Sequence, residues 1–187
     1  MKRFVILAVW LCSSGICLAQ DYTGELQLTY QRVQSFTFNS GSSFFNVDGA
    51  ALNGGGFGFV YNITNKFGLF QQMGFFGGVE QNGLKIRMIT ELQGVRLTAH
   101  KGPFDFYAKG GLGFTRYVFE VSGGTAGVDS HLALVYGGGT EFRIPGGLFM
   151  IIDASRLTMG LPNLTNLPGR SKWSNSFLLS TGVAFRF

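Results

Sequence analysis

The chain has 187 residues, of which 45% are hydrophobic, 15% aromatic and only 13% charged. This length suits one domain with a substantial core, and the composition excludes intrinsic disorder. The net charge is +5, but Lys2 and Arg3 supply two of these charges and no cluster of Lys and Arg follows them. A nucleic-acid-binding footprint is therefore missing. Twenty-nine Gly and 20 Phe beside only four Pro favour a sheet-rich fold.

The first nineteen residues have the three regions of a secretory signal peptide. Lys2 and Arg3 form the positive region, residues 4–12 are an unbroken apolar run, and the small residues Cys17 and Ala19 lie where signal peptidase cleaves. The apolar run is too short to span a bilayer, which takes about 20 residues. We therefore predict that residues 1–19 are removed on export and that residues 20–187 form the mature domain.

Both cysteines, Cys12 and Cys17, fall inside the predicted signal peptide. The mature domain then has no thiol, which excludes disulfides, thiolate catalysis and cysteine-based metal sites. A lipoprotein anchor is not expected, because Leu11 and Ile16 precede the cysteines where that motif needs a small residue. No later stretch reaches the 18 apolar residues of a membrane-spanning helix.

Beyond Gln20 the dominant pattern is the two-residue alternation that is typical of β-strands. In the segment 177–187, aromatic and aliphatic residues at odd positions alternate mostly with small or polar residues at even positions. The same pattern recurs in the segments 25–31, 86–93, 104–115, 132–144 and 148–155. The Gly- and Phe-rich segments 52–61 and 67–79 are predicted strands whose two faces the composition does not separate. The sequence thus predicts eight strands.

The connections between these strands are expected to alternate in length. The short ones are 62–66, 99–103 and 145–147, the long ones are 38–51, 119–130 and 160–174, and 80–84 is a short exception. Such alternation is typical of a barrel with short periplasmic turns and longer external loops. We therefore predict an all-β fold, an eight-stranded antiparallel up-and-down transmembrane β-barrel.

A soluble β-sandwich also alternates, but its outward faces are polar or charged. Here one face of each strand is aliphatic or aromatic, and the other carries Gly, Ser, Thr and the charges. The face that carries Gly, Ser, Thr and the charges would make a poor sandwich core, but it suits the lumen of a narrow barrel. This interpretation turns the apolar side chains toward lipid, including Ile86, Met88 and Leu92 and an external aromatic girdle of Tyr117, Phe119 and Trp173.

Nine charged residues are assigned to the lumen. The interior of an eight-stranded barrel is only just wide enough for side chains, and charges held away from bulk water must pair. We predict a lumen closed by salt bridges, with a narrow path for small ions as the alternative. The residues of this predicted network are Glu25, Arg87, Glu91, Asp105, Lys109, Glu141, Arg143, Asp153 and Arg186.

No pattern in the sequence indicates an enzyme. The glycine runs 54–56 and 137–139 lack the Lys-Ser/Thr that completes a phosphate-binding loop. His100 and His131 lie at opposite ends of the predicted barrel, so they cannot share a site. The run 129–131 (Asp-Ser-His) does not predict a triad, because successive strand residues point to opposite faces. We expect no catalytic residue, no cofactor and no metal.

The chain ends in Gly-Val-Ala-Phe-Arg-Phe, with alternate apolar residues at Val183 and Phe185 and an aromatic residue, Phe187, in the last position. This ending resembles the C-terminal signal of outer-membrane barrels. The mature chain resembles the small outer-membrane β-barrel domain family, best known from OmpA-like transmembrane domains. The resemblance implies contact with bacterial outer-membrane lipid, periplasmic chaperones and insertion by the barrel-assembly machinery, with Val183, Phe185 and Phe187 as the insertion signal.

From these features we expect a monomeric, non-enzymatic outer-membrane barrel that contributes to envelope integrity or surface interaction and has no nucleic-acid partner. A narrow ion-conducting pore is the first alternative. An adhesin that acts through its external loops is the second, and residues 160–174 form the most distinctive of these loops.

Overall fold

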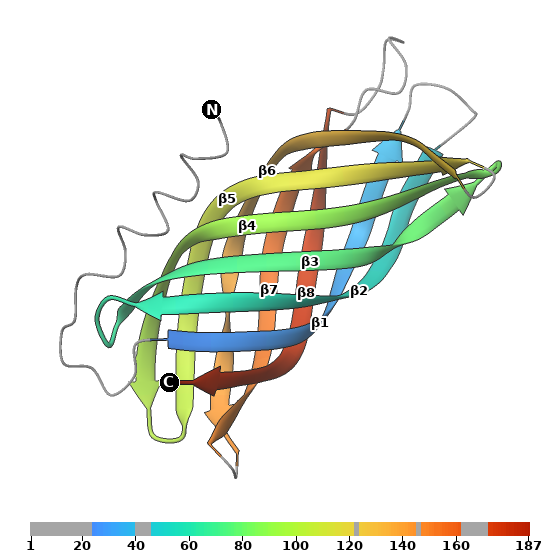
Figure 1. Ribbon diagram of the computed structural model, residues 1–187. Helices are drawn as coiled ribbons and strands as arrows, with labels where there is room; N and C mark the ends of the chain where they lie inside the picture. The colour runs from blue at the N-terminus through green and yellow to red at the C-terminus, as the bar shows by residue number, and fades with distance from the viewer. Residues whose placement is uncertain (1–23, 40–45, 122–123, 145–146, 162–171) are drawn as a thin grey trace, which may run out of the picture.

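The computed structural model describes residues 24–39, 46–121, 124–144, 147–161 and 172–187 (Figure 1). They form eight antiparallel strands in a closed barrel in which each strand pairs with the next and β8 returns to β1. This confirms the predicted up-and-down fold. The predicted signal peptide, residues 1–19, lies outside the described residues. The strands are β1 Gly24–Asn39, β2 Asn46–Asn62, β3 Phe67–Gln81, β4 Leu84–Lys101, β5 Phe104–Val121, β6 Gly124–Arg143, β7 Leu148–Gly160 and β8 Trp173–Arg186.

The barrel closes where its two chain ends meet. Glu25 of β1 is the register partner of Arg186 of β8. The amide of Gly24 donates to the carbonyl oxygen of Phe187 over 2.9 Å, and the amide of Phe187 donates to the carbonyl oxygen of Gly24 over 3.0 Å. We call this end of the barrel, with Gly24 and Phe187, the terminal end, and the opposite end the distal end. Closure gives every strand two neighbours and leaves no edge strand.

The distal connections are shorter than the sequence predicted. The predicted loop 119–130 is wrong, because β5 runs to Val121 and β6 starts at Gly124. A register shift between Phe119 and Glu120 interrupts the alternation there, which hid the strand from the pattern. The β3–β4 connection is a tight turn in which Asn82 and Gly83 both have positive φ.

The outward face of the barrel is a continuous aliphatic and aromatic belt. Large apolar side chains such as Leu28, Leu112 and Leu134 lie exposed on it. Near the terminal end the belt becomes aromatic, and the rings of Phe185 and Phe187 stack with their centroids 6.1 Å apart. An apolar outer wall of this kind is expected of a barrel surrounded by lipid.

The distal half of the lumen is filled by apolar side chains, which the sequence interpretation placed on the wrong face. Ile86, Met88 and Leu92 point inward and are buried, as are Tyr117 and Phe119, so none of them faces lipid or joins an aromatic girdle. The reason is that the distal strand ends surround a hydrophobic core and the polar interior is confined to the terminal half. For these residues the two-residue alternation was predicted correctly, but the side chains that were expected to face outward face the lumen.

Inward-facing glycines let neighbouring strands approach closely in the middle of the barrel. A Cβ at Gly113 of β5 would overlap the Glu91 carbonyl of β4, and a Cβ at Gly94 would lie 2.5 Å from the Cα of Gly111. Figure 1 shows that β4 and β5 bend strongly along their length. Glycine permits this geometry because it has no Cβ.

We predict that Gly113→Ala destabilises the barrel and that Gly110→Ala does not. A methyl group at Gly113 must displace the backbone of β4, which typically costs about 1–3 kcal/mol of stability. Gly110 lies on the same strand, and its added Cβ would meet nothing within 4 Å. Thermal unfolding of both variants in detergent measures the difference. Equal unfolding temperatures would show that β4 and β5 can separate freely at this point.

Candidate functional site

The terminal half of the lumen contains a compact network of charged side chains from five strands. Glu25 of β1 and Arg186 of β8 are register partners, as are Asp105 of β5 and Glu141 of β6. Arg96 of β4 completes the group from across the lumen. Each side chain points inward because its position alternates with outward belt residues on the same strand.

Two guanidinium groups hold three carboxylates in this network. Arg96 contacts Glu25 at 3.0 Å and Glu141 at 2.7 Å through its two terminal nitrogens. Arg186 contacts Glu25 at 2.8 Å through Nε and Asp105 at 2.6 Å through Nη1, and its Nη2 contacts Glu141. The planar fork of arginine suits such multiple contacts. All five side chains are buried or nearly so, which makes their pairing a condition of stability.

Aromatic rings support both arginines. The guanidinium carbon of Arg96 lies 4.1 Å from the centroid of the Tyr107 ring, and that of Arg186 lies 3.7 Å from the centroid of Phe149. Such stacking is favourable when the cation is removed from water. The rings also fill the space beside the ion pairs.

A second ion pair lies deeper in the lumen. Lys109 Nζ is 3.0 Å from Asp153 Oδ2 and also donates to Gln72 Oε1 over 3.0 Å. The carboxylate of Asp153 accepts two further hydrogen bonds, from the hydroxyls of Tyr107 and Ser155, each 2.9 Å long. Both charges are therefore paired and hydrogen-bonded, as buried charges need to be.

His100 joins the network at the rim of the terminal end. Its Nδ1 is 2.7 Å from Asp105 Oδ1, and its Nε2 is 2.6 Å from the carbonyl oxygen of Asn65. Both partners can only accept a hydrogen bond, so the geometry favours the doubly protonated ring. With that proton, the four lumen carboxylates face four cations and the interior is electrically balanced.

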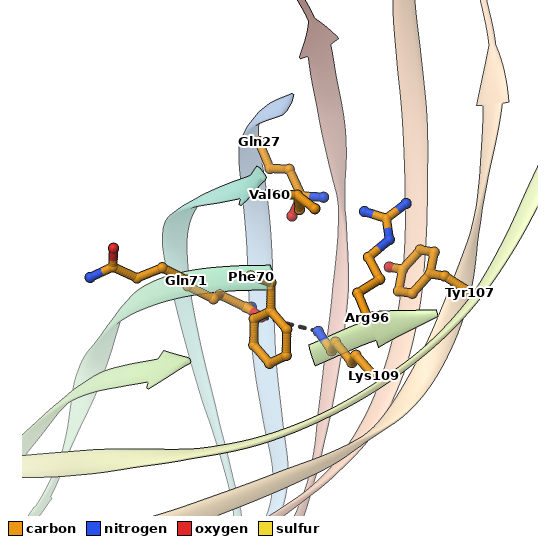
Figure 2. Close-up of a pocket in the computed structure, with 8 residues that line it drawn as sticks. Gln27, Val60, Phe70, Gln71, Arg96, Tyr107 and Lys109 are labelled. Carbon is orange, nitrogen blue, oxygen red and sulfur yellow. Dashed lines mark hydrogen bonds between the residues drawn. The ribbon is translucent and has the colours of Figure 1, made fainter. Parts of the chain in front are cut away.

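A cavity of about 10 Å³ remains between the two groups, lined in part by Val60, Phe70 and Gln27. Figure 2 shows Arg96 beside Tyr107 and Lys109 beside Phe70 around it. This volume is about what one water molecule occupies. At this level the described side chains leave no path for a hydrated ion.

Most of the predicted lumen residues lie in this site, and three do not. Arg87 and Glu91 are exposed on the outer wall, where Arg87 pairs with Glu120 at 3.3 Å. Arg143 is exposed at the terminal end, 5.5 Å from the ring centroid of Phe149. Arg87 and Glu91 were misassigned because they alternate with Met88 and its neighbours, which face inward.

The sequence interpretation missed Arg96 and His100. The local pattern Val95-Arg96-Leu97 contained the signal for Arg96, since two belt residues flank one inward arginine. The signal was concealed because Ile86 and Leu92 had been assigned to the lipid-facing side, and Arg96 lies on the same face of the strand. His100 was assigned to a turn, whereas β4 continues to Lys101.

In the part of the chain that the structure describes, the other polar groups show no catalytic arrangement. His131 Nε2 lies 2.8 Å from Asp129 Oδ2, but Ser130 is exposed on the opposite face of β6. Among the described residues no three His, Asp or Glu side chains converge to hold a metal ion.

No protein-family model matches this chain, and a search of curated proteins finds no match. Solved structures do match. Neisserial surface protein A has 12% identity over 90% of this chain and 98% of its own, with a TM-score of 0.66. The N-terminal β-barrel domain of Pseudomonas aeruginosa OprF has 14% identity over 89% and 100%, with a TM-score of 0.56. A major outer membrane protein from Thermus thermophilus has 11% identity over 87% and 99%, with a TM-score of 0.57.

These comparisons establish the fold. The chain is similar over nearly its whole length to small outer-membrane β-barrels, which confirms the resemblance that its alternating strands and its C-terminal residues predicted. At these identities the likeness says nothing about the roles of individual residues.

We predict that Glu141→Ala lowers the stability of the folded barrel by about 3–5 kcal/mol, the usual effect of removing one member of a buried ion pair. Both Arg96 and Arg186 lose a carboxylate in this variant. Thermal unfolding in detergent provides the measurement.

Arg143→Ala is the matched control for this experiment, because Arg143 lies two residues away and is exposed. We expect its effect to stay within about 0.5 kcal/mol. Wild-type stability of Glu141→Ala would mean that water replaces the lost carboxylate and that the network does not hold the lumen together.

Proposed function

We propose that the protein is a non-enzymatic, closed outer-membrane β-barrel that contributes to the bacterial envelope as a membrane-embedded structural element. The observation that carries this proposal is the double closure of the lumen. The terminal half is closed by the charged network around Arg96 and Arg186, and the distal half by a layer of apolar side chains.

Location in the outer membrane is supported by the outer wall and by the similar structures. The strands have 13 to 20 residues, more than the roughly 9–11 that a tilted membrane-spanning strand needs. The exposed belt residues on them are aliphatic and aromatic. We further propose that residues 1–19 are the export signal, so that both chain ends of the mature barrel face the periplasm.

The closed lumen argues against a narrow pore. Leu92, Leu157 and Leu178 point into the distal half and are fully buried. A layer packed with such side chains stays dry, because its lining offers no hydrogen bonds to water. An ion would have to cross this layer after passing the charged network.

Adhesion through external loops remains the other expectation from the sequence. Residues 162–171, which make up most of the distinctive loop 160–174, lie outside the described residues. No observation on the described residues favours adhesion over the structural role.

We propose that Val183, Phe185 and Phe187 are the signal that the barrel-assembly machinery reads during insertion. All three side chains face outward from the closing strand. The Phe187 ring lies 6.3 Å from the Phe59 ring of β2, and its backbone makes the last hydrogen bonds of the β1–β8 seam. The residues that would recruit the machinery are thus those that complete the barrel.

We predict that the wild type shows no stable conductance steps in planar bilayers. Glu141→Ala should also stay closed although it is less stable, because the distal layer of Leu92, Leu157 and Leu178 is intact in it. Single-channel recording at both polarities measures this, with an open porin as the positive control. Steady unitary currents through the wild type would refute the closed-barrel proposal and favour the pore.

We also predict that the protein purified from membranes begins at Gln20 and migrates differently on gels before and after boiling. A closed barrel without edge strands resists detergent at room temperature and unfolds only when heated. N-terminal sequencing and gel mobility are the measurements. Met1 at the start of the inserted protein would exclude signal cleavage, and a single mobility would argue against a stable barrel.

A further inference from the structure

Two amides and a carboxylate lie among the apolar belt residues on the outer wall of β3 and β4. Gln71 and Gln93 are register partners, and both point outward. Figure 2 shows Gln71 extending away from the lumen cavity. Glu91 lies two residues before Gln93 on β4 and is exposed, with Met73 as its register partner on β3.

The surroundings of the two amides are apolar. Along β3 and β4 the next outward pair toward the terminal end is Leu69 and Val95, and on β5 the register partner of Gln93 is Leu112. All three neighbours are exposed belt residues. The amides therefore lie within the belt and not at its rim.

Within the described part of the chain, neither Gln71 nor Gln93 has a side-chain hydrogen bond, and Glu91 has no ion pair. Hydrocarbon chains offer neither donors nor acceptors, so amides that face them are left unsatisfied. A polar group in such a position is expected to have a partner. That partner must be able to both donate and accept hydrogen bonds, since an amide does both.

The wall beside the amides is hollowed. A groove of about 650 Å³ runs along it, and its lining includes Leu69, Val95 and Leu112 together with both glutamines. Gly110 also lines it, and a Cβ there would meet nothing within 4 Å. Small residues at such a place let another protein surface approach closely.

We propose that this surface, which we call the amide face (Gln71, Gln93 and the groove at Gly110), is the interface with a second copy of the same chain in a two-fold symmetric dimer. The proposal rests on the membrane location proposed above. It replaces the expectation of a monomer.

A two-fold dimer makes the amide face self-complementary. When both copies are inserted in the same direction, the two-fold axis must run along the membrane normal, so identical residues lie at identical depth. Gln71 and Gln93 of one copy then meet the same two residues of the other. Each amide has two N–H donors and one acceptor oxygen, which the facing amides match.

Lipid is the competing occupant of the groove. An acyl chain would fill its apolar walls, but it would leave both amides without partners. On the opposite side of the barrel, Thr181 of β8 faces outward between its register partners Tyr30 and Ile152, and neither partner carries an amide or a carboxylate. Thr181 is therefore a matched control for the amide face.

The experiment uses single cysteines, because the predicted mature chain has none. Val95→Cys places a thiol on the amide face while both glutamines are kept, and Thr181→Cys places one on the opposite wall. After reconstitution in phospholipid vesicles and dilution with added lipid, oxidation should cross-link Val95→Cys into a dimer and leave Thr181→Cys monomeric. Adding Gln71→Leu and Gln93→Leu to the Val95→Cys protein should lower the dimer yield at least about tenfold.

Heat-dependent gel mobility and protection from added protease are measured first, so that each variant is known to be folded and inserted. A protein that fails this check contradicts the proposed membrane location. A folded and inserted Val95→Cys protein that stays monomeric, with or without bound lipid in the groove, overturns the dimer alone. Equal cross-linking of Thr181→Cys, or full cross-linking after both glutamines are replaced, also overturns it.

Discussion

The structure depends on the ion pairs between Arg96, Arg186 and the carboxylates that surround them. Eight strands enclose a lumen with room for side chains and almost none for water, so every inward charge must find its counter-charge there. Arg186 contacts three carboxylates, and Arg96 binds two of the same three from the opposite wall. These contacts join the β1–β8 seam to β4, β5 and β6, and so link strand closure to lumen closure.

Above this network the barrel changes its interior chemistry. Leu92, Leu157 and Leu178 fill the distal half much as they would fill the core of a soluble protein. The outer wall changes from apolar to charged toward the distal end, where Arg87 and Glu120 form an ion pair on the exterior. A strand such as β4 therefore has an apolar exterior and a charged interior at one end, and an apolar interior with charges outside at the other.

This change explains how far the sequence alone could be interpreted. Alternation predicted all eight strands, because the two-residue period of a strand is the same whether its apolar face points outward or inward. The direction of the faces was predictable where the contrast stays constant, as in β8 with Phe185 outside and Arg186 inside. It was not predictable in β4, where Met88 and Arg96 share the inward face despite opposite polarity, nor in the Gly- and Phe-rich β2 and β3. Residue contacts across the lumen, such as Arg96 with Glu25, depend on the stagger of the closed sheet, which no local pattern encodes.

The same network accounts for the outward position of Gln93. A shift of β4 by one residue would turn Gln93 inward, but it would also turn Arg96 outward into the belt, since all side chains of a strand change face together. Glu25 and Glu141 would then share Arg186 alone, and a guanidinium would face hydrocarbon. An outward amide at Gln93 is less costly than that exchange, because an amide can be satisfied by hydrogen bonds from a facing surface, whereas a buried carboxylate needs its cation. The register that closes the lumen thus leaves Gln93 outside, where the proposed dimer would give its amide a partner.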